Sequence, residues 1–227
     1  MSARKGSTEA NPFPIERVLS KVEKAVQAFR LPIVTEQSLR RRDPFRVLVS
    51  TVISLRTKDD VTEKASERLF ALADSPKGLL ELGENRIADA IYPAGFYHTK
   101  AKNLIEISRQ LLETFNGRVP EELEDLLALP GVGRKTANLV RTLGFGLPGI
   151  CVDTHVHRIT NRWGYVITRN PEETEMALRE RLPGKYWIPI NDWLVAYGQN
   201  LCVPISPHCS RCPVFEDCAR VGVTKHR

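Results

Sequence analysis

The stretch Leu129-Pro-Gly-Val-Gly-Arg-Lys-Thr-Ala137 decides how this 227-residue sequence is expected to fold. A helical segment over residues 122–129 ends at a Gly-x-Gly hairpin, and a second helical segment follows over residues 134–143. Gly131 and Gly133 can adopt positive φ angles and carry no side chain, so a ligand can approach the backbone closely. Successive N–H groups at such a helix start bind anions, and a nucleic-acid phosphate fits there. The alternative is an ordinary turn between two helices.

Two side chains near this hairpin carry possible chemistry. Lys135 lies in the first turn of the second helical segment, where the positive end of the helix dipole disfavours an ammonium ion. A neutral lysine amine is a nucleophile that can form a Schiff base. Eighteen residues further on, Val152-Asp-Thr-His155 opens another helical stretch, with Asp153 as a natural N-cap. Capping alone would explain Asp153, but a capped carboxylate is also held rigidly enough for catalysis.

Helical periodicity dominates the rest of the chain. Apolar residues recur at spacings of three and four in several stretches, for example Phe45, Leu48, Val49, Val52 and Ile53, then Val61, Ala65, Leu69 and Leu72, then Ala101, Leu104, Ile105, Leu111, Leu112 and Phe115. Arg56 continues the first stripe, so it either extends from a core helix or emerges into a cleft. Because no stretch alternates polar and apolar residues, the sequence predicts an all-α fold.

The composition is that of a globular protein without a membrane segment. Hydrophobic residues make up 42% of the chain and the net charge is +6, which excludes disorder along the whole chain and weakly indicates a polyanionic partner. No apolar run approaches the ~20 residues that span a bilayer. The first residues lack the apolar core of a secretory signal. We therefore expect a soluble intracellular protein with a polar, flexible segment over residues 1–12.

Four of the five cysteines, Cys202, Cys209, Cys212 and Cys218, follow the spacing C-x6-C-x2-C-x5-C. Disulfides would close only small loops and leave the rest of the chain without a cross-link. Four close thiols in a reducing compartment indicate a metal site, either an iron–sulfur cluster or a tetrahedral zinc. The spacing favours the cluster, because only one C-x2-C pair is present. Cys151 lies in an apolar run and is expected to be buried and unreactive.

These motifs together resemble the endonuclease III family of helix-hairpin-helix DNA glycosylases, which contain an iron–sulfur cluster. The resemblance rests on the hairpin, the Val152-Asp-Thr-His-Val-His-Arg158 segment and the cysteine pattern, and it covers roughly residues 30–220. Further motifs that carry it are Asp43-Pro-Phe45, Ser54-Leu-Arg-Thr-Lys-Asp59 and Gly95-Phe-Tyr-His-Thr-Lys100.

The resemblance implies a fold of two helical domains on either side of a DNA-binding cleft. A six-helix barrel would comprise residues 37–147, with the helix-hairpin-helix motif at about 122–143. Residues 13–36 and 148–227 would form the iron–sulfur cluster domain. The tail cysteines Cys202, Cys209, Cys212 and Cys218 would hold a 4Fe-4S cluster.

The resemblance also implies an activity. The family removes oxidised pyrimidines from duplex DNA and then cleaves the strand at the abasic site. Lys135 matches the amine that attacks C1′, and Asp153 matches the essential carboxylate. The chain would thus be a bifunctional DNA glycosylase/AP lyase of base excision repair. It would act as a monomer in the cytoplasm on nucleoid DNA, without a membrane partner.

Several residues are expected to contact DNA. Phe96 matches the apolar wedge that fills the gap left by the extruded base, although a core aromatic is the alternative. Arg56 stands where the family usually has a glutamine, which alters the expected preference for the opposite base. Gly131, Val132 and Gly133 would contact the DNA backbone. The five basic residues between 134 and 162 are expected to form a patch that faces DNA, namely Arg134, Lys135, Arg141, Arg158 and Arg162. The family's loop between the first two cluster cysteines tends to be basic, but residues 203–208 contain no Lys or Arg.

Three other interpretations compete. An adenine-specific glycosylase of the same superfamily carries a glutamate near Ser50-Thr51, lacks the lysine and needs a further recognition domain. A thymine-mismatch enzyme typically lacks the lysine as well. A DNA-binding scaffold without activity would need neither Lys135 nor Asp153, so the presence of both argues against it.

Overall fold

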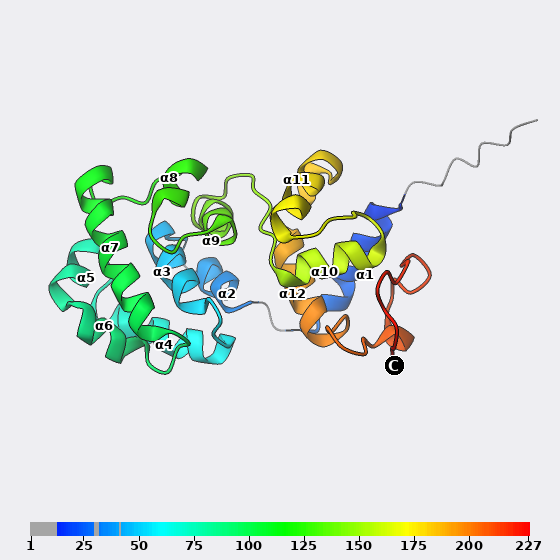
Figure 1. Ribbon diagram of the computed structural model, residues 1–227, viewed down its shortest axis with the longest axis horizontal. Coiled ribbons are helices and arrows are strands. Elements are labelled where there is room, and N and C mark those ends of the chain that lie inside the picture. Colours follow the sequence, from blue (N-terminus) through cyan, green and yellow to red (C-terminus); the bar gives the residue numbers. More distant parts are fainter. Residues whose placement is uncertain (1–12, 30–31, 41) are drawn as a thin grey trace, which may run out of the picture.

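The computed structural model describes residues 13–29, 32–40 and 42–227, and the segment 1–12 that was expected to be flexible lies outside them. Every regular element of the described residues is helical, so the predicted all-α class is confirmed. The elements fall into two lobes (Figure 1). In the part of the chain described, no helix combines the length and apolar character needed to cross a membrane.

The first lobe packs around helix α3, whose predicted apolar stripe is buried. Asp43 caps this helix by accepting hydrogen bonds from the Phe45 and Arg46 N–H groups at 3.0 and 3.2 Å, and Pro44 occupies the first helical position. The elements of this lobe are α2 (Ile33–Arg40), α3 (Pro44–Ser54), α4 (Asp59–Leu72), α5 (Pro76–Leu82), α6 (Glu84–Ile91), α7 (Tyr97–Phe115), α8 (Leu123–Ala128), α9 (Arg134–Leu139) and the π-helix η1 (Val140–Phe145).

The second lobe combines the first helix of the described chain with the helices of its last third. Helix α1 packs against α12, which also contacts α10 (Figure 1). A separate apolar core lies inside this lobe, with Trp163 and Tyr197 among its largest buried side chains. Its elements are α1 (Ile15–Val26), α10 (Thr154–Trp163), α11 (Pro171–Arg181), η2 (Gly184–Tyr186), α12 (Pro189–Asn200) and η3 (Cys209–Arg211).

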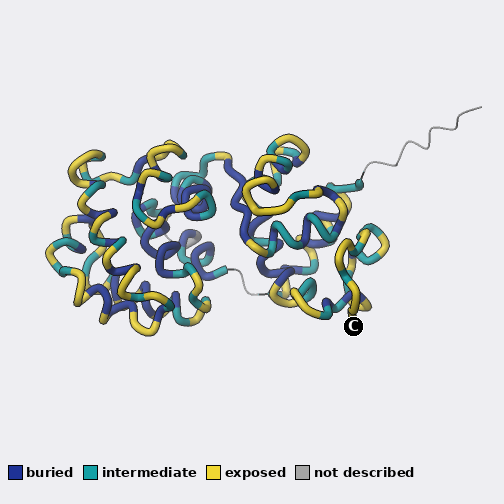
Figure 2. Tube along the Cα trace, in the orientation of Figure 1, coloured by how far each residue is buried: buried dark blue, intermediate teal, exposed yellow. Residues whose placement is uncertain are grey.

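The two cores are separate, and buried segments run through the interior of each lobe (Figure 2). Ile33 and Val34 pack in the first core, although the expected domain boundary assigns residues 13–36 to the other domain. The predicted division into one domain of residues 37–147 and another of residues 13–36 and 148–227 stays a prediction.

The helical segment expected over residues 134–143 changes its winding part-way along. Helix α9 ends at Leu139 and continues as the wider coil of η1. The Thr142 hydroxyl donates to the Asn138 carbonyl at 2.8 Å and thereby competes for the helical ladder. Gly144 packs against Pro44, where a Cβ atom would lie 2.9 Å from the Pro44 Cα. The wider coil thus brings the end of this segment directly against the start of α3.

Candidate active site

Lys135 and Asp153 line the same hollow between the lobes. This cavity has a volume of about 350 Å³, and its walls include residues of both lobes, among them Arg56, Lys135, Asp153, His155, Asn191 and Gln199. An adjoining, more open hollow of about 640 Å³ is lined by Arg134, Pro171 and Glu175, among others. Arg56, Lys135, Asp153 and Thr154 line both hollows. The fold therefore gathers the predicted lysine and carboxylate in one cleft.

Cys151 joins the segment that carries Asp153 to the helix that carries Lys135. Its thiol lies 3.6 Å from the Lys135 carbonyl oxygen, and the Asn191 amide donates to the Cys151 carbonyl at 3.4 Å. The cysteine is buried, as the sequence predicts, and this burial raises the pKa of its thiol far above the ordinary value. Cys151 is therefore a packing residue rather than a nucleophile.

Asp153 is the N-cap of α10, as predicted. Its Oδ1 accepts hydrogen bonds from the His155 and Val156 N–H groups at 2.8 and 2.9 Å. The residue is 9% exposed and borders both hollows. These bonds fix the orientation of a carboxylate that a charged reaction centre in the cleft can reach.

His155 lines the cleft, but no role was inferred for it from the sequence. Its Nδ1 lies 3.0 Å from an Arg158 guanidinium nitrogen. Burial lowers the pKa of His155, and the charges of Arg158 and Lys135 act in the same direction, against that of Asp153. Gly198 leaves room for the ring, because a Cβ atom there would collide with Nδ1. In the sequence, the only feature that points to His155 is its place in the segment that contains Asp153.

Arg56 lines the cleft, and Phe96 lies beside it on a neighbouring loop. Helix α3 ends at Ser54, so Arg56 does not continue the helical stripe but lies beyond it, with φ +52°. Phe96 precedes α7 with φ +57° and is 63% exposed, which excludes the alternative of a core aromatic. The Arg56 guanidinium carbon lies 5.5 Å from the centre of the Phe96 ring.

The hairpin between α8 and α9 differs in one detail from the expectation. Gly131 has φ +73°, but Gly133 has φ −95°, a value that any residue adopts. A Cβ atom at Gly131 would collide with the side-chain amide of Asn103, whereas one at Gly133 would meet open space. Val132 is buried in the first core. Gly131 is thus required by the turn and its packing, and Gly133 leaves the backbone open to a partner.

The four tail cysteines lie near one another in the second lobe, with Cys209 buried and the other three partly exposed. The Tyr197 hydroxyl lies 2.9 Å from the Cys212 sulfur, and the Arg220 N–H donates to the Cys218 sulfur at 3.3 Å. Cys209 and Cys212 border a hollow of about 300 Å³. Within the described ranges, no three His, Cys, Asp or Glu side chains are arranged to hold a metal ion. The donor chemistry nevertheless suits an iron–sulfur cluster, because thiolates are its protein ligands.

The arginines expected to face DNA have partners within the protein. Arg158 donates to the Cys202 carbonyl at 2.9 Å, and Arg162 donates to the Val203 and Pro204 carbonyls at 2.8 and 2.6 Å. Arg141 donates to the Glu121 carbonyl at 2.6 Å, and Arg134 pairs with Glu175. These internal contacts use part of the donors of the four arginines, and the expected DNA-facing patch stays a prediction. Arg158 and Arg162 also hold the loop that begins at the first tail cysteine.

Comparison with known proteins agrees with this geometry. Residues 49–184 match the HhH-GPD superfamily of base excision DNA repair proteins. Endonuclease III of Thermotoga maritima is 51% identical over 179 residues, which cover 79% of this chain and 84% of that protein. The chain belongs to the endonuclease III family. It is accordingly an enzyme of base excision repair, of the DNA glycosylase and AP lyase class.

More distant members of the endonuclease III family agree. The Escherichia coli enzyme is 38% identical over 77% of this chain and 83% of its own length. A solved structure titled as a trapped covalent endonuclease III–DNA intermediate, an estranged-adenine complex, superposes with a TM-score of 0.81. It is 31% identical and covers 91% of this chain and 94% of its own.

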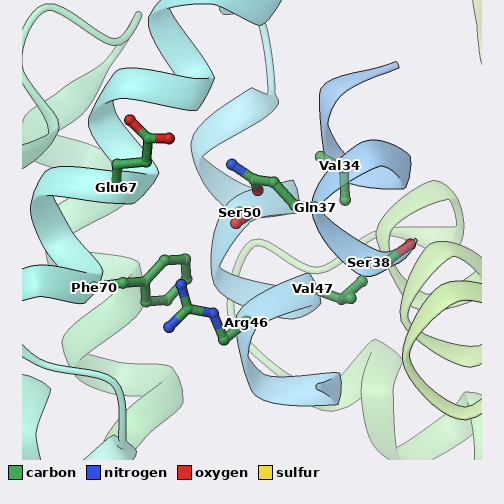
Figure 3. Close-up of a pocket in the computed structure, with 8 residues that line it drawn as sticks. All are labelled: Val34, Gln37, Ser38, Arg46, Val47, Ser50, Glu67 and Phe70. Atoms are coloured by element: carbon green, nitrogen blue, oxygen red, sulfur yellow. The ribbon is translucent and has the colours of Figure 1, made fainter. Parts of the chain in front are cut away.

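A further cavity of about 210 Å³ lies between α2, α3 and α4 (Figure 3), and Val34 borders both this cavity and the cleft. Arg46 lies 4.0 Å above the Phe70 ring in its wall, and Gln37, Ser50 and Glu67 also border it. None of the predicted site residues lines this cavity. The predicted catalytic residues, Lys135 and Asp153, line the cleft between the lobes instead.

Proposed function

We propose that this enzyme removes oxidised pyrimidines from duplex DNA and then cleaves the strand at the abasic site through a lysine Schiff base. The observation that carries the proposal is that Lys135 and Asp153 line one cleft between the two lobes. Lys135 supplies an amine and Asp153 a carboxylate fixed by two backbone N–H groups. A nucleophile next to a fixed negative charge is what the expulsion of a base from a sugar requires.

In the first stage, the Lys135 amine attacks C1′ of the damaged nucleotide. The C1′–base bond breaks as the C1′–nitrogen bond forms, and the base leaves with the bonding electron pair. Positive charge develops on the sugar during this step, and the Asp153 carboxylate stabilises it. Asp153 also accepts a proton from the attacking amine.

In the second stage, the sugar ring opens and the nitrogen–C1′ linkage becomes a Schiff base. This linkage acidifies the C2′ hydrogen, so loss of that proton expels the 3′ phosphate by β-elimination. Water then hydrolyses the Schiff base and frees Lys135. The enzyme is regenerated because the amine that enters the first stage leaves unchanged.

Duplex DNA must release the damaged base from its stack, at a cost of a few kcal/mol. We assign Phe96 and Arg56 to the gap that remains, since Arg56 lines the cleft and the exposed Phe96 ring lies beside its guanidinium group. The arginine donates to acceptors of the orphaned base and favours guanine O6 and N7. Gly131, Val132 and Gly133 present backbone groups to a DNA phosphate. We expect a monomer to act on nucleoid DNA in the cytoplasm.

We assign a 4Fe-4S cluster to Cys202, Cys209, Cys212 and Cys218. When bound, such a cluster cross-links the tail through its thiolate ligands. The chain's own arginines, Arg158 and Arg162, hold the adjoining loop through its carbonyl groups. The proposed base removal and β-elimination exchange no electrons with the protein. The cluster is therefore proposed as a structural element.

An adenine-specific enzyme fits less well. Adenine-specific enzymes carry a glutamate near the positions that Ser50 and Thr51 occupy in this chain. The Thr51 hydroxyl donates to the Val47 carbonyl at 2.7 Å inside the core. Lys135 likewise argues against glycosylases that use water and stop at the abasic site.

Borohydride trapping tests the proposal. The wild-type enzyme, reduced while bound to a duplex with an abasic site, should form a covalent complex. Lys135→Gln should form none, while its DNA affinity stays within about tenfold, a change of about 1.4 kcal/mol. Binding without trapping by the wild-type enzyme would support a DNA-binding scaffold and overturn the proposal.

A further inference from the structure

Lys100 is a buried lysine that the proposed chemistry does not use. It lies in the first turn of α7 and is 5% exposed. Its ammonium donates to the Ile53 carbonyl at 2.6 Å, the Leu55 carbonyl at 2.6 Å and the Thr57 hydroxyl at 2.8 Å. A lysine is almost never buried without such partners. All three N–H groups of Lys100 are thus directed at one short segment, residues 53–57.

The partners of Lys100 lie at the C-terminal end of α3, where carbonyl groups lack helical donors and the helix dipole is negative. A positive charge at this end stabilises the helix terminus. Burial lowers the pKa of the Lys100 ammonium to about 8. The three acceptors offset part of this desolvation, so the lysine fastens the chain where it leaves α3.

The same contacts connect two loops. The Thr57 hydroxyl, which accepts from Lys100, also accepts the Gly95 N–H at 3.1 Å. A Cβ atom at Gly95 would lie 2.6 Å from the Arg56 carbonyl oxygen, so only glycine allows the two backbones to approach this closely. The loop that carries Arg56 and the loop that carries Phe96 are therefore in direct backbone contact.

Both residues are held in an unfavourable backbone conformation. Arg56 and Phe96 have φ values of +52° and +57°, in the left-handed region that residues with a side chain rarely occupy. Such conformations are unfavourable and persist only where the surroundings fix them. The contacts of Lys100 and Thr57 and the close approach of Gly95 supply those surroundings.

We propose that Lys100 is a positioning residue that fixes Arg56 and Phe96 relative to each other, so that both enter the duplex as one unit. This inference rests on the proposed roles of Arg56 and Phe96 as the groups that fill the gap. Lys100 itself does not touch the DNA. It acts through the loop of residues 53–57 and, by way of Thr57 and Gly95, through the loop that carries Phe96.

The inference predicts a specific defect. Without the ammonium, the two loops separate, and Arg56 addresses the opposite base from a less defined position. Excision from paired DNA should slow, and discrimination between opposite bases should weaken. The reaction of Lys135 and Asp153 should persist on a single-stranded abasic substrate, because that substrate has neither a base to extrude nor an opposite base.

The test compares Lys100→Met, which keeps the length of the side chain without its donors, with Lys100→Arg, which keeps the charge. Lys102→Met, at an exposed position of the same helix, is the matched control. Single-turnover excision is measured on duplexes with thymine glycol opposite adenine or guanine. Trapping is measured on a single-stranded abasic oligonucleotide, and thermal melting reports folding.

For Lys100→Met we expect excision from duplex DNA to slow by about tenfold to a hundredfold, as for a misplacement of about 1 Å, with single-stranded trapping within about twofold of wild type. The ratio of the excision rates opposite adenine and opposite guanine should move toward unity in Lys100→Met. Lys100→Arg should recover part of the wild-type excision rate and rate ratio. Lys102→Met should match the wild type. Equal losses on both substrates with an unchanged ratio would show a merely structural role and overturn the inference.

Two further arms keep the result decisive. If Lys100→Met does not fold, Thr57→Val removes the hydroxyl between the loops and should produce the same defect in weaker form, whereas an unchanged ratio for Thr57→Val would contradict the inference. In an Arg56→Ala, Phe96→Ala background, Lys100→Met should add no further loss. Failure of wild-type trapping would overturn the proposed function, whereas intact trapping with an unaffected Lys100→Met would overturn this inference alone.

Discussion

Arg134 and Glu175 form a two-bonded ion pair that joins α9 to α11. The Arg134 Nε and Nη2 groups each donate to a carboxylate oxygen of Glu175 at 2.8 Å, and Arg179 donates to the same carboxylate at 2.9 Å. Glu175 is only 2% exposed. Because Arg134 directly precedes Lys135, this pair fixes the helix of the proposed nucleophile to the second lobe.

Removing this carboxylate should destabilise the protein strongly. Burial alone would raise the pKa of Glu175, but the hydrogen bonds and charges of Arg134 and Arg179 outweigh it and hold that pKa below the usual value. Glu175→Gln leaves two arginines without their counter-charge, which costs about 3–5 kcal/mol. Thermal melting should fall by about 10 °C. Glu180→Gln, exposed on the same helix, is the control, and equal melting of the two variants would contradict the expectation.

Phe96→Ala should slow base excision more on paired DNA than on a duplex with a pre-formed abasic site. The wedge compensates for unstacking, which costs a few kcal/mol, so a loss of about tenfold or more is expected on the paired substrate alone. Single-turnover rates on the two duplexes measure the difference. Ile167→Ala, another exposed apolar residue, should change neither rate. Equal slowing of both reactions by Phe96→Ala would point to packing instead.

Asp192 gives the stability of the protein a defined pH dependence. Its Oδ1 accepts a hydrogen bond from Thr35 of the other lobe at 2.7 Å, and burial raises its pKa from 3.8 to about 6. The folded state therefore retains a proton that the unfolded chain releases, so stability falls as pH rises from about 4 to 6 and is constant above.

Asp192→Asn keeps an acceptor for Thr35 but removes the charge. It should raise the melting temperature by a few degrees at pH 7.5, for a gain of about 1–3 kcal/mol, and leave it unchanged at pH 4. Asp89→Asn, at an exposed position, serves as the control. A variant that melts like the wild type at pH 7.5 would show that Asp192 bears no cost of burial.

The proposed cluster predicts a visible chromophore and bound iron. Protein purified without oxygen should contain iron and sulfide, and Cys212→Ala should lose both. Cys151→Ala is the matched control, because this thiol is buried in the first core, away from the tail. Zinc without iron, or iron retained by Cys212→Ala, would contradict the assignment.

Local features of the structure were predictable from the sequence. The stripe of α3 and the cap by Asp153 depend on residues within a few positions of one another, and both are present. Partners far apart in the chain were not predictable. Arg134 and Glu175 are separated by 41 residues, and each also fits a solvated surface position.

Lys100 illustrates the same limit. A lysine in the first turn of a helix is ordinarily exposed, and its burial follows only from the position of the end of α3. The internal carbonyl acceptors of Arg141, Arg158 and Arg162 were likewise not predictable from the sequence. Those carbonyls belong to loops whose course depends on the tertiary fold.

The most direct test of the central claim, that Lys135 is the nucleophile, is the location of the trapped bond. After borohydride reduction on an abasic duplex, digestion with protease and nuclease followed by mass spectrometry should find the sugar remnant on Lys135. A remnant on any other lysine or on the N-terminal amine would contradict the account.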